Sequence, residues 1–135
     1  MDKLKWIAFM LVFLLLFGCA GIETGKKMTL FDETARAYLR SLRWGDYEEA
    51  YAFKNLLETD NKMPDFENLR QVRVTGYNVK QTILSEDQST ILRVVDFQYY
   101  RITNVTVKNL IDRQTWEYDE EANRWYLTSD LPGFK

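Results

Sequence analysis

The residues best placed to do chemistry form a short segment near the N-terminus, Leu16-Phe17-Gly18-Cys19. Its cysteine is the only one in the chain, and it follows an uncharged apolar run over residues 6–17. Lys3 and Lys5 precede that run. A positively charged start, about a dozen apolar residues and a small residue before the cut are the parts of a secretory signal peptide. The sequence therefore predicts export, with cleavage just before the cysteine.

The same segment carries a resemblance to a known class of proteins. Leu16 at position −3, Gly18 at −1 and Cys19 at +1 resemble the lipobox of bacterial lipoproteins, although Phe17 at −2 is bulkier than the usual residue. In that family the cysteine thiol takes a diacylglyceryl group, the signal is cut before it, and the new amino terminus is usually acylated, with palmitate as a typical chain. The resemblance implies an anchor in the membrane through acyl chains on Cys19.

The residue after the cysteine bears on which membrane is used. In bacterial lipoproteins an Asp at this position favours retention at the inner membrane, and here Ala20 stands there. The resemblance therefore implies the periplasmic face of an outer membrane, or an extracytoplasmic, membrane-anchored protein in an organism with one membrane.

Two alternatives compete with lipidation. A transmembrane anchor needs about 20 apolar residues, and residues 4–22 reach that length only if Gly18, Cys19, Ala20 and Gly21 are counted. An ordinary cleaved signal would leave a solitary free thiol in an exported protein, which is a reactive liability. Acylation explains both the position of the cysteine and its lack of a disulfide partner, so we expect lipidation.

The composition excludes several classes of function. The chain has 135 residues and no histidine, so it lacks the commonest metal ligand and the usual general base at neutral pH. Serine–histidine and cysteine–histidine catalysis are excluded, and with the cysteine acylated we expect no metal site and no cofactor. The 18 Lys and Arg against 20 Asp and Glu leave no concentrated basic segment, so we expect no nucleic-acid partner.

The chain after the signal is long enough for one domain with a single core. We expect a signal peptide over residues 1–18, the lipidated cysteine and a tether over 19–28, and a single domain over 29–135. Thr29 is predicted to be an N-cap, with Asp32 as its capping-box partner. After it, apolar residues recur at helical spacing on one face: Phe31, Ala35, Tyr38, Leu39 and Leu42.

Further helical segments follow the first. Gly45 is predicted to end the first helix and Asp46 to begin a second, which extends to about Leu57. Met63-Pro64 is predicted to start a short third turn.

From about residue 70 the apolar period changes to two, which is typical of strands. Long strands are predicted over residues 71–84, 89–101 and 105–118, with a short one over 124–128. The alternation slips near Gly76 and again between Val107 and Leu110, which predicts two β-bulges. Helices followed by long antiparallel strands predict an α+β fold, with the helices on one face of a curved sheet of about four strands.

Two segments resemble the nuclear-transport-factor-2-like (NTF2-like, cystatin-like) superfamily of cone-shaped α+β domains. One is the opening helix pair over residues 35–52, with Gly45-Asp46-Tyr47 and Ala50-Tyr51. The other is the closing hairpin, Trp116-Glu117-Tyr118 followed by Arg124-Trp125-Tyr126-Leu127. The resemblance implies a pocket between the sheet and the helices. It fixes no activity, because this fold carries isomerases, dehydratases and binding modules.

Two carboxylates are candidates for catalysis. In ketosteroid-isomerase members of that superfamily an Asp base works with a Tyr and an acidic partner. Asp96 and, more weakly, Asp112 lie in mid-strand among apolar residues, where burial would raise the pKa of a carboxyl group. The alternative is that the Asp96 side chain faces solvent, and no residue here matches a catalytic motif.

Three other features have a functional and a plainer interpretation. One is a group of aromatic residues, which could line a pocket for an apolar ligand or could be core: Tyr38, Tyr51, Phe97, Tyr99, Trp116 and Trp125. The acidic segment Asp119-Glu120-Glu121 could bind a cation or be a solvated loop. Asn104-Val105-Thr106 matches a glycosylation sequon, a three-residue pattern that occurs by chance.

The expected function follows from these observations. We expect a lipid-anchored envelope protein with a non-catalytic domain that binds a protein partner or a small apolar molecule. The alternative is a small pocket enzyme of the isomerase or dehydratase type that uses Asp96 and a tyrosine. An accessory subunit of an outer-membrane assembly is a variant of the first expectation.

Overall fold

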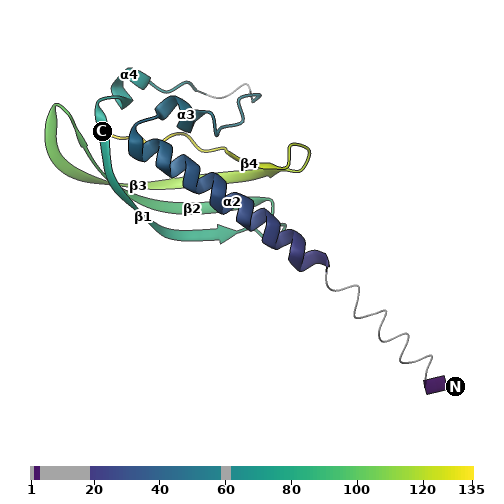
Figure 1. Ribbon diagram of the computed structural model, residues 1–135. Helices are drawn as coiled ribbons and strands as arrows, with labels where there is room; N and C mark the ends of the chain where they lie inside the picture. The colour runs from purple at the N-terminus through teal and green to yellow at the C-terminus, as the bar shows by residue number, and fades with distance from the viewer. Residues whose placement is uncertain (1, 4–18, 59–61) are drawn as a thin grey trace.

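The computed structural model describes residues 2–3, 19–58 and 62–135 (Figure 1). Its elements are helices α2 (Cys19–Trp44), α3 (Tyr47–Tyr51) and α4 (Phe66–Leu69), then strands β1 (Val72–Leu84), β2 (Thr90–Arg101), β3 (Asn104–Asp119) and β4 (Arg124–Leu127). The strands form one antiparallel sheet in the order β1-β2-β3-β4. The sheet curves around α2, which crosses it on one face (Figure 1). The predicted α+β class is confirmed.

The apolar stripe of α2 is the centre of the core. All five residues predicted for that stripe are buried, and they pack against the inner face of the sheet. The rings of Phe31 and Tyr38 meet Trp116 of β3 edge to face, with centroids 5.8 and 5.3 Å away. Edge-to-face pairs add roughly 0.5–1.5 kcal/mol each beyond the area they bury. The helix is therefore fixed to the sheet along its apolar stripe.

The start of α2 differs from the prediction. The helix begins at Cys19, so the segment expected to be a tether is helical and the expected N-cap at Thr29 is wrong. The Thr29 hydroxyl instead donates a hydrogen bond to the carbonyl oxygen of Gly25 within the helix, at 2.9 Å. Contacts with the sheet override the local capping signal: the indole N–H of Trp125 donates to the Lys27 carbonyl at 3.0 Å, and Met28 packs against the core.

The end of α2 is the one predicted. Gly45 adopts φ +81°, the amide of Gly45 donates to the Leu42 carbonyl, and the amide of Asp46 donates to the Ser41 carbonyl. This pair of hydrogen bonds is a Schellman motif, which needs a left-handed residue at the position of Gly45. Helix α3 then begins as expected but ends at Tyr51, so Leu57 is 92% exposed and the predicted length of this helix is wrong.

Helix α4 starts two residues later than predicted. Its N-cap is Asp65, whose carboxylate accepts a hydrogen bond from the Asn68 amide at 3.1 Å.

The sheet is bent by bulges close to the predicted positions. The pairing of β1 with β2 shifts between Val74 and Gly76, as expected, and a second time between Val79 and Gln81. The pairing of β2 with β3 shifts between Tyr99 and Arg101, which lies nearer the turn than the predicted position. Each extra residue kinks its strand and increases its twist, so the sheet curves enough to wrap around α2.

The C-terminal segment fills part of the concave face. The ring of Phe134 is buried and lies 5.8 Å from the ring of Phe97 and 4.9 Å from that of Tyr99. The Tyr99 hydroxyl donates to the Lys135 carbonyl at 3.0 Å. The ammonium group of buried Lys54 donates to the Ser129 carbonyl, also at 3.0 Å. The tail is therefore an integral part of the core.

Two glycine substitutions test the length and the end of α2. Gly45→Ala should lower the free energy of unfolding by about 1 kcal/mol, because alanine is strained at positive φ. Gly25→Ala should raise it by about 0.5–1 kcal/mol, because Gly25 lies inside the helix and a Cβ there meets no atom within 4 Å. Denaturant unfolding of the detergent-solubilised protein measures both. A Gly25→Ala variant without added stability would contradict a helix that begins at Cys19.

Candidate functional site

Cys19, the residue expected to be lipidated, lies at the end of the longest helix in the described part of the chain. Cys19 is the first residue of α2, and the other residues of the predicted signal and cleavage site, Gly18 included, lie outside the described ones apart from residues 2–3. Figure 1 shows that this end of α2 extends past the sheet, away from α3 and α4. In the described part of the chain, no helix combines the length and the apolar character needed to cross a membrane.

A cavity of about 430 Å³ lies close to this end of α2, between the helix and the hairpin that joins β3 to β4; we call it the hairpin cavity. Lys27 and Glu120 form an ion pair across it at 2.5 Å, and the Lys27 ammonium lies 4.6 Å from the centre of the Tyr118 ring. The hydrogen bond from Lys27 to Glu120 raises the pKa of the lysine. The acidic loop is thus tied to the helix by the ion pair of Glu120 with Lys27. Within the loop, the Asp119 carboxylate accepts hydrogen bonds from the backbone amides of Glu121 and Ala122.

The six aromatic residues proposed as pocket lining are divided by the structure. Five of them are buried in the packed core: Tyr38, Phe97, Tyr99, Trp116 and Trp125. Tyr51 is half-buried and lines a second cavity. The ring of Phe134 occupies the space beside Phe97 and Tyr99, so the centre of the concave face is filled by the protein's own tail.

The second cavity, which we call the tail cavity, has a volume of about 360 Å³ and lies between α3, α4 and the C-terminal segment. Apolar side chains make up much of its lining: Tyr51, Met63, Pro64, Leu69, Leu131, Pro132 and Phe134. Lys54, Lys62, Asp65 and Asp130 stand among them. A mostly apolar concavity with a few polar groups is the usual form of a small-molecule site. Tyr51, one of the six aromatic residues proposed as pocket lining, lines this cavity.

Asp96, the first catalytic candidate, lies on the outer face of the sheet. Its neighbours in the strand, Val95 and Phe97, are buried on the inner face, so alternation points Asp96 the other way. Its carboxylate accepts a hydrogen bond from the Asn109 amide at 3.1 Å and lies 3.8 Å from the Lys80 ammonium. This placement, opposite to the helices, gives no geometric support to a pocket base paired with a tyrosine.

Asp112, the weaker candidate, lies on the inner face instead. Residues 110, 112, 114 and 116 of β3 pair with the inward residues 97, 95, 93 and 91 of β2, which places Asp112 beside Gln114 under α2. The indole N–H of Trp116 donates to the Gln114 side-chain oxygen at 3.2 Å, and the Gln114 amide nitrogen donates to the Asp112 carboxylate at 2.9 Å. Burial raises the pKa of Asp112 to about 6, and the bond from Gln114 opposes that shift.

Two other polar groups share the inner face with Asp112. The hydroxyl of Tyr38 is buried and has no hydrogen-bond partner among the described residues. Burial raises the pKa of Tyr38 well above its ordinary value, and the nearby Asp112 carboxylate adds to the shift. Arg93 places its guanidinium 5.4 Å from the centre of the Phe31 ring. Sequence analysis did not single out Arg93, although its odd number in β2, shared with Ile91 and Val95, indicated the inner face.

No protein-family model matches this chain, and no curated protein matches its sequence.

The buried carboxyl group leads to a pH-dependent prediction. The folded pKa of Asp112 is about 6 against an ordinary value of 3.8, so between these values the folded chain binds more protons at this site than the unfolded chain. The free energy of unfolding that depends on Asp112 is therefore highest below about pH 4, and it falls as the pH rises from there through about 6. Asp112→Asn should leave the free energy of unfolding nearly unchanged at about pH 4 and raise it by about 1–3 kcal/mol at about pH 8. Denaturant unfolding at the two pH values measures the difference.

Asp96→Asn is the matched control, because it removes a carboxylate from the outer face of the same sheet. An equal gain at high pH in this control would assign the effect to net charge and contradict a cost of burying Asp112.

Proposed function

We propose that this chain is a bacterial lipoprotein of the cell envelope, held on the membrane by acyl chains on Cys19. The observation that carries the proposal is the position of the only cysteine, directly after Gly18 and an uncharged apolar run. Each buried methylene contributes roughly 0.8 kcal/mol, so two or three acyl chains hold a protein firmly on a bilayer. Ala20 after the cysteine favours the periplasmic face of an outer membrane.

Because helix α2 begins at Cys19, the distance from the proposed anchor to the rest of the domain is defined. Lys27 lies eight positions after Cys19 in α2, a distance of about 12 Å along a helix. Lys27 is itself tied to Glu120 and to Trp125 of the sheet. An acylated Cys19 would therefore hold the hairpin between β3 and β4 close to the lipid headgroups.

Cys19→Ser should abolish both lipid labelling and membrane association, because the hydroxyl group of serine does not replace the thiol in the thioether to diacylglycerol. Metabolic labelling with palmitate and fractionation of membranes measure the two effects. Ala20→Ser is the matched control, since it introduces the same side chain one residue later and should keep both properties. Labelling of the Cys19→Ser protein would contradict the proposal.

We further propose that the domain is a non-catalytic binding module of NTF2-like form, and that its site is the tail cavity. The support is the apolar lining of this cavity and its position between the helices and the tail. The lack of histidine in the chain and the outward position of Asp96 favour binding over catalysis. The ligand class is a small apolar molecule or an apolar side chain of a protein partner.

Binding of the neutral fluorescent probe N-phenyl-1-naphthylamine tests this site. Gly133 lines the tail cavity and a Cβ built on it meets no atom within 4 Å, so the backbone there accepts a side chain and Gly133→Leu adds volume to the lining. The probe should fluoresce more strongly with the wild-type protein than without protein. Gly133→Leu should weaken binding of the probe at least about threefold. Gly25→Leu is the control, because Gly25 also has open space but does not line this cavity. Equal binding by all three proteins would place the probe elsewhere and count against the tail cavity.

A further inference from the structure

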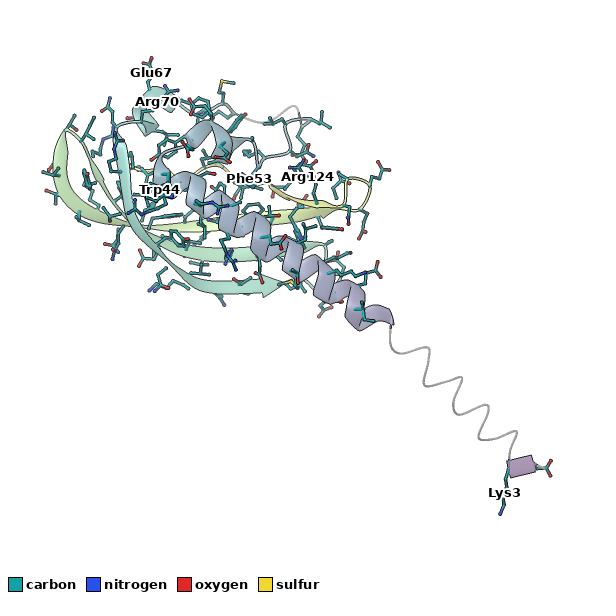
Figure 2. The ribbon with its side chains drawn as sticks, in the orientation of Figure 1. Lys3, Trp44, Phe53, Glu67, Arg70 and Arg124 are labelled. Carbon is teal, nitrogen blue, oxygen red and sulfur yellow. The ribbon has the colours of Figure 1, made fainter. Side chains whose placement is uncertain are left out.

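A third cavity, of about 370 Å³, lies at the C-terminal end of α2, where the helix passes strand β1. We call it the arginine cavity, because Arg43 and Arg73 line it together with Trp44 and Tyr100. Figure 2 shows Trp44 at this end of the helix, beside β1. The indole of Trp44 is 70% exposed, whereas Trp116 and Trp125 are buried. An exposed tryptophan beside two guanidinium groups has no role in the core.

The charge of this cavity sets it apart from the other two. Its lining includes two arginines and no carboxylate, whereas Glu23 and Glu120 line the hairpin cavity and Asp130 lines the tail cavity. Four cations of the described residues have a carboxylate within 4 Å: Lys27, Lys54, Arg70 and Lys80. Arg43 and Arg73 have none within that distance in the described part of the chain. Two arginines without a carboxylate partner among the described residues therefore line one concavity of a protein whose formal net charge is −2.

Both guanidinium groups are held in place by neighbours. One terminal nitrogen of Arg73, Nη1, donates to the carbonyl oxygens of Arg70 and Val72 at 2.6 and 3.0 Å, which leaves its Nη2 and Nε donors for a ligand. The guanidinium of Arg43 lies 5.2 Å from the centre of the Trp44 ring. Arginines fixed in this way lose less side-chain entropy when they bind an anion.

We infer that the arginine cavity binds an anionic saccharide, that is, a sugar carrying a phosphate or a carboxylate group. Guanidinium groups match the planar and tetrahedral oxygens of carboxylates and phosphates with paired hydrogen bonds. Trp44, which is exposed, and Tyr100, which is half-buried, line the cavity and offer an apolar surface to the ring of the sugar. The two parts of the ligand thus correspond to the two kinds of side chain in the cavity.

The position of the cavity decides between a lipid headgroup and a ligand away from the membrane. Arg43 lies twenty-four positions after Cys19 in α2, which is about 36 Å along a helix. If Cys19 is the anchor, as the proposed function states, the arginine cavity lies at the far end of the domain from the acyl chains. Its ligand is then a saccharide in the space beyond the bilayer and not a headgroup of the anchoring leaflet.

Isothermal titration calorimetry on the detergent-solubilised full chain tests the inference, with glucose 6-phosphate, glucuronate, glucose and inorganic phosphate as probes. Glucose 6-phosphate or glucuronate should bind with a Kd of about 1 mM or tighter, and glucose should not bind. Arg43→Gln and Arg73→Gln should each weaken binding at least about tenfold. Trp44→Ala should weaken the binding of the charged sugar and leave that of inorganic phosphate unchanged, since phosphate has no ring to stack.

Arg36→Gln is the matched control, because Arg36 is an exposed arginine of the same helix that does not line the cavity. An equal loss of binding in Arg36→Gln would assign the effect to overall charge and overturn the inference, as would the absence of binding by both charged sugars. Arg73→Lys, which keeps the charge but not the paired donors, provides a second variant in case Arg73→Gln unfolds, and it too should bind more weakly than wild type. None of these outcomes bears on lipid labelling at Cys19, so failure here is distinguishable from failure of the anchor.

Discussion

The packing of α2 against Trp116 is the interaction on which the rest of the structure depends. Phe31 and Tyr38, two turns apart on the helix, both place their edges or faces against this one indole. The indole N–H is satisfied by Gln114, and Gln114 in turn donates to Asp112. One buried tryptophan thus joins the helix to the sheet and also sets the orientation of the polar groups beneath the helix. Removal of the ring would leave the amide of Gln114 buried without one of its partners, a cost that adds to the lost apolar contact.

Because α2 is one continuous helix, it couples the two ends of the domain. Its first turns are held by Trp125 and Glu120 near the hairpin, and its last turn ends at the Schellman motif beside β1. A flexible segment after Cys19 would leave its direction relative to the sheet free, whereas here the residues from Cys19 to Arg43 form one helix that is packed against the sheet from about Lys27 onward. The hairpin cavity and the arginine cavity are therefore separated by most of the length of the helix, so two separate sites can exist at opposite ends of one small domain.

The sequence predicted those helices and strands in which apolar residues recur at a regular spacing. The stripe of α2 and the left-handed Gly45 follow from spacing or from the conformational demands of one residue. The start of α2 before Thr29 was not predictable, because the contacts that hold this part of the helix at Lys27 come from β4 and the hairpin before it, about a hundred residues later in the chain. The same applies to Asp112: its direction depends on the register of β3 with β2, which is shifted near the turn and which local alternation does not reveal.

The tail explains why a set of aromatic residues that resembles a pocket lining is a packed core. Residues 131–134 have no helical or strand period, so nothing in the sequence indicated that Phe134 would insert between the sheet and the helices. Burial of a phenylalanine side chain contributes roughly 1.5–3 kcal/mol, and two ring contacts and the bonds of Lys54 to Ser129 and Asp130 hold the segment in place. An apolar ligand at the centre of the sheet would have to displace all of these contacts. A ligand in the tail cavity needs to displace none, so binding beside Tyr51 is favoured over binding at the centre of the curved sheet.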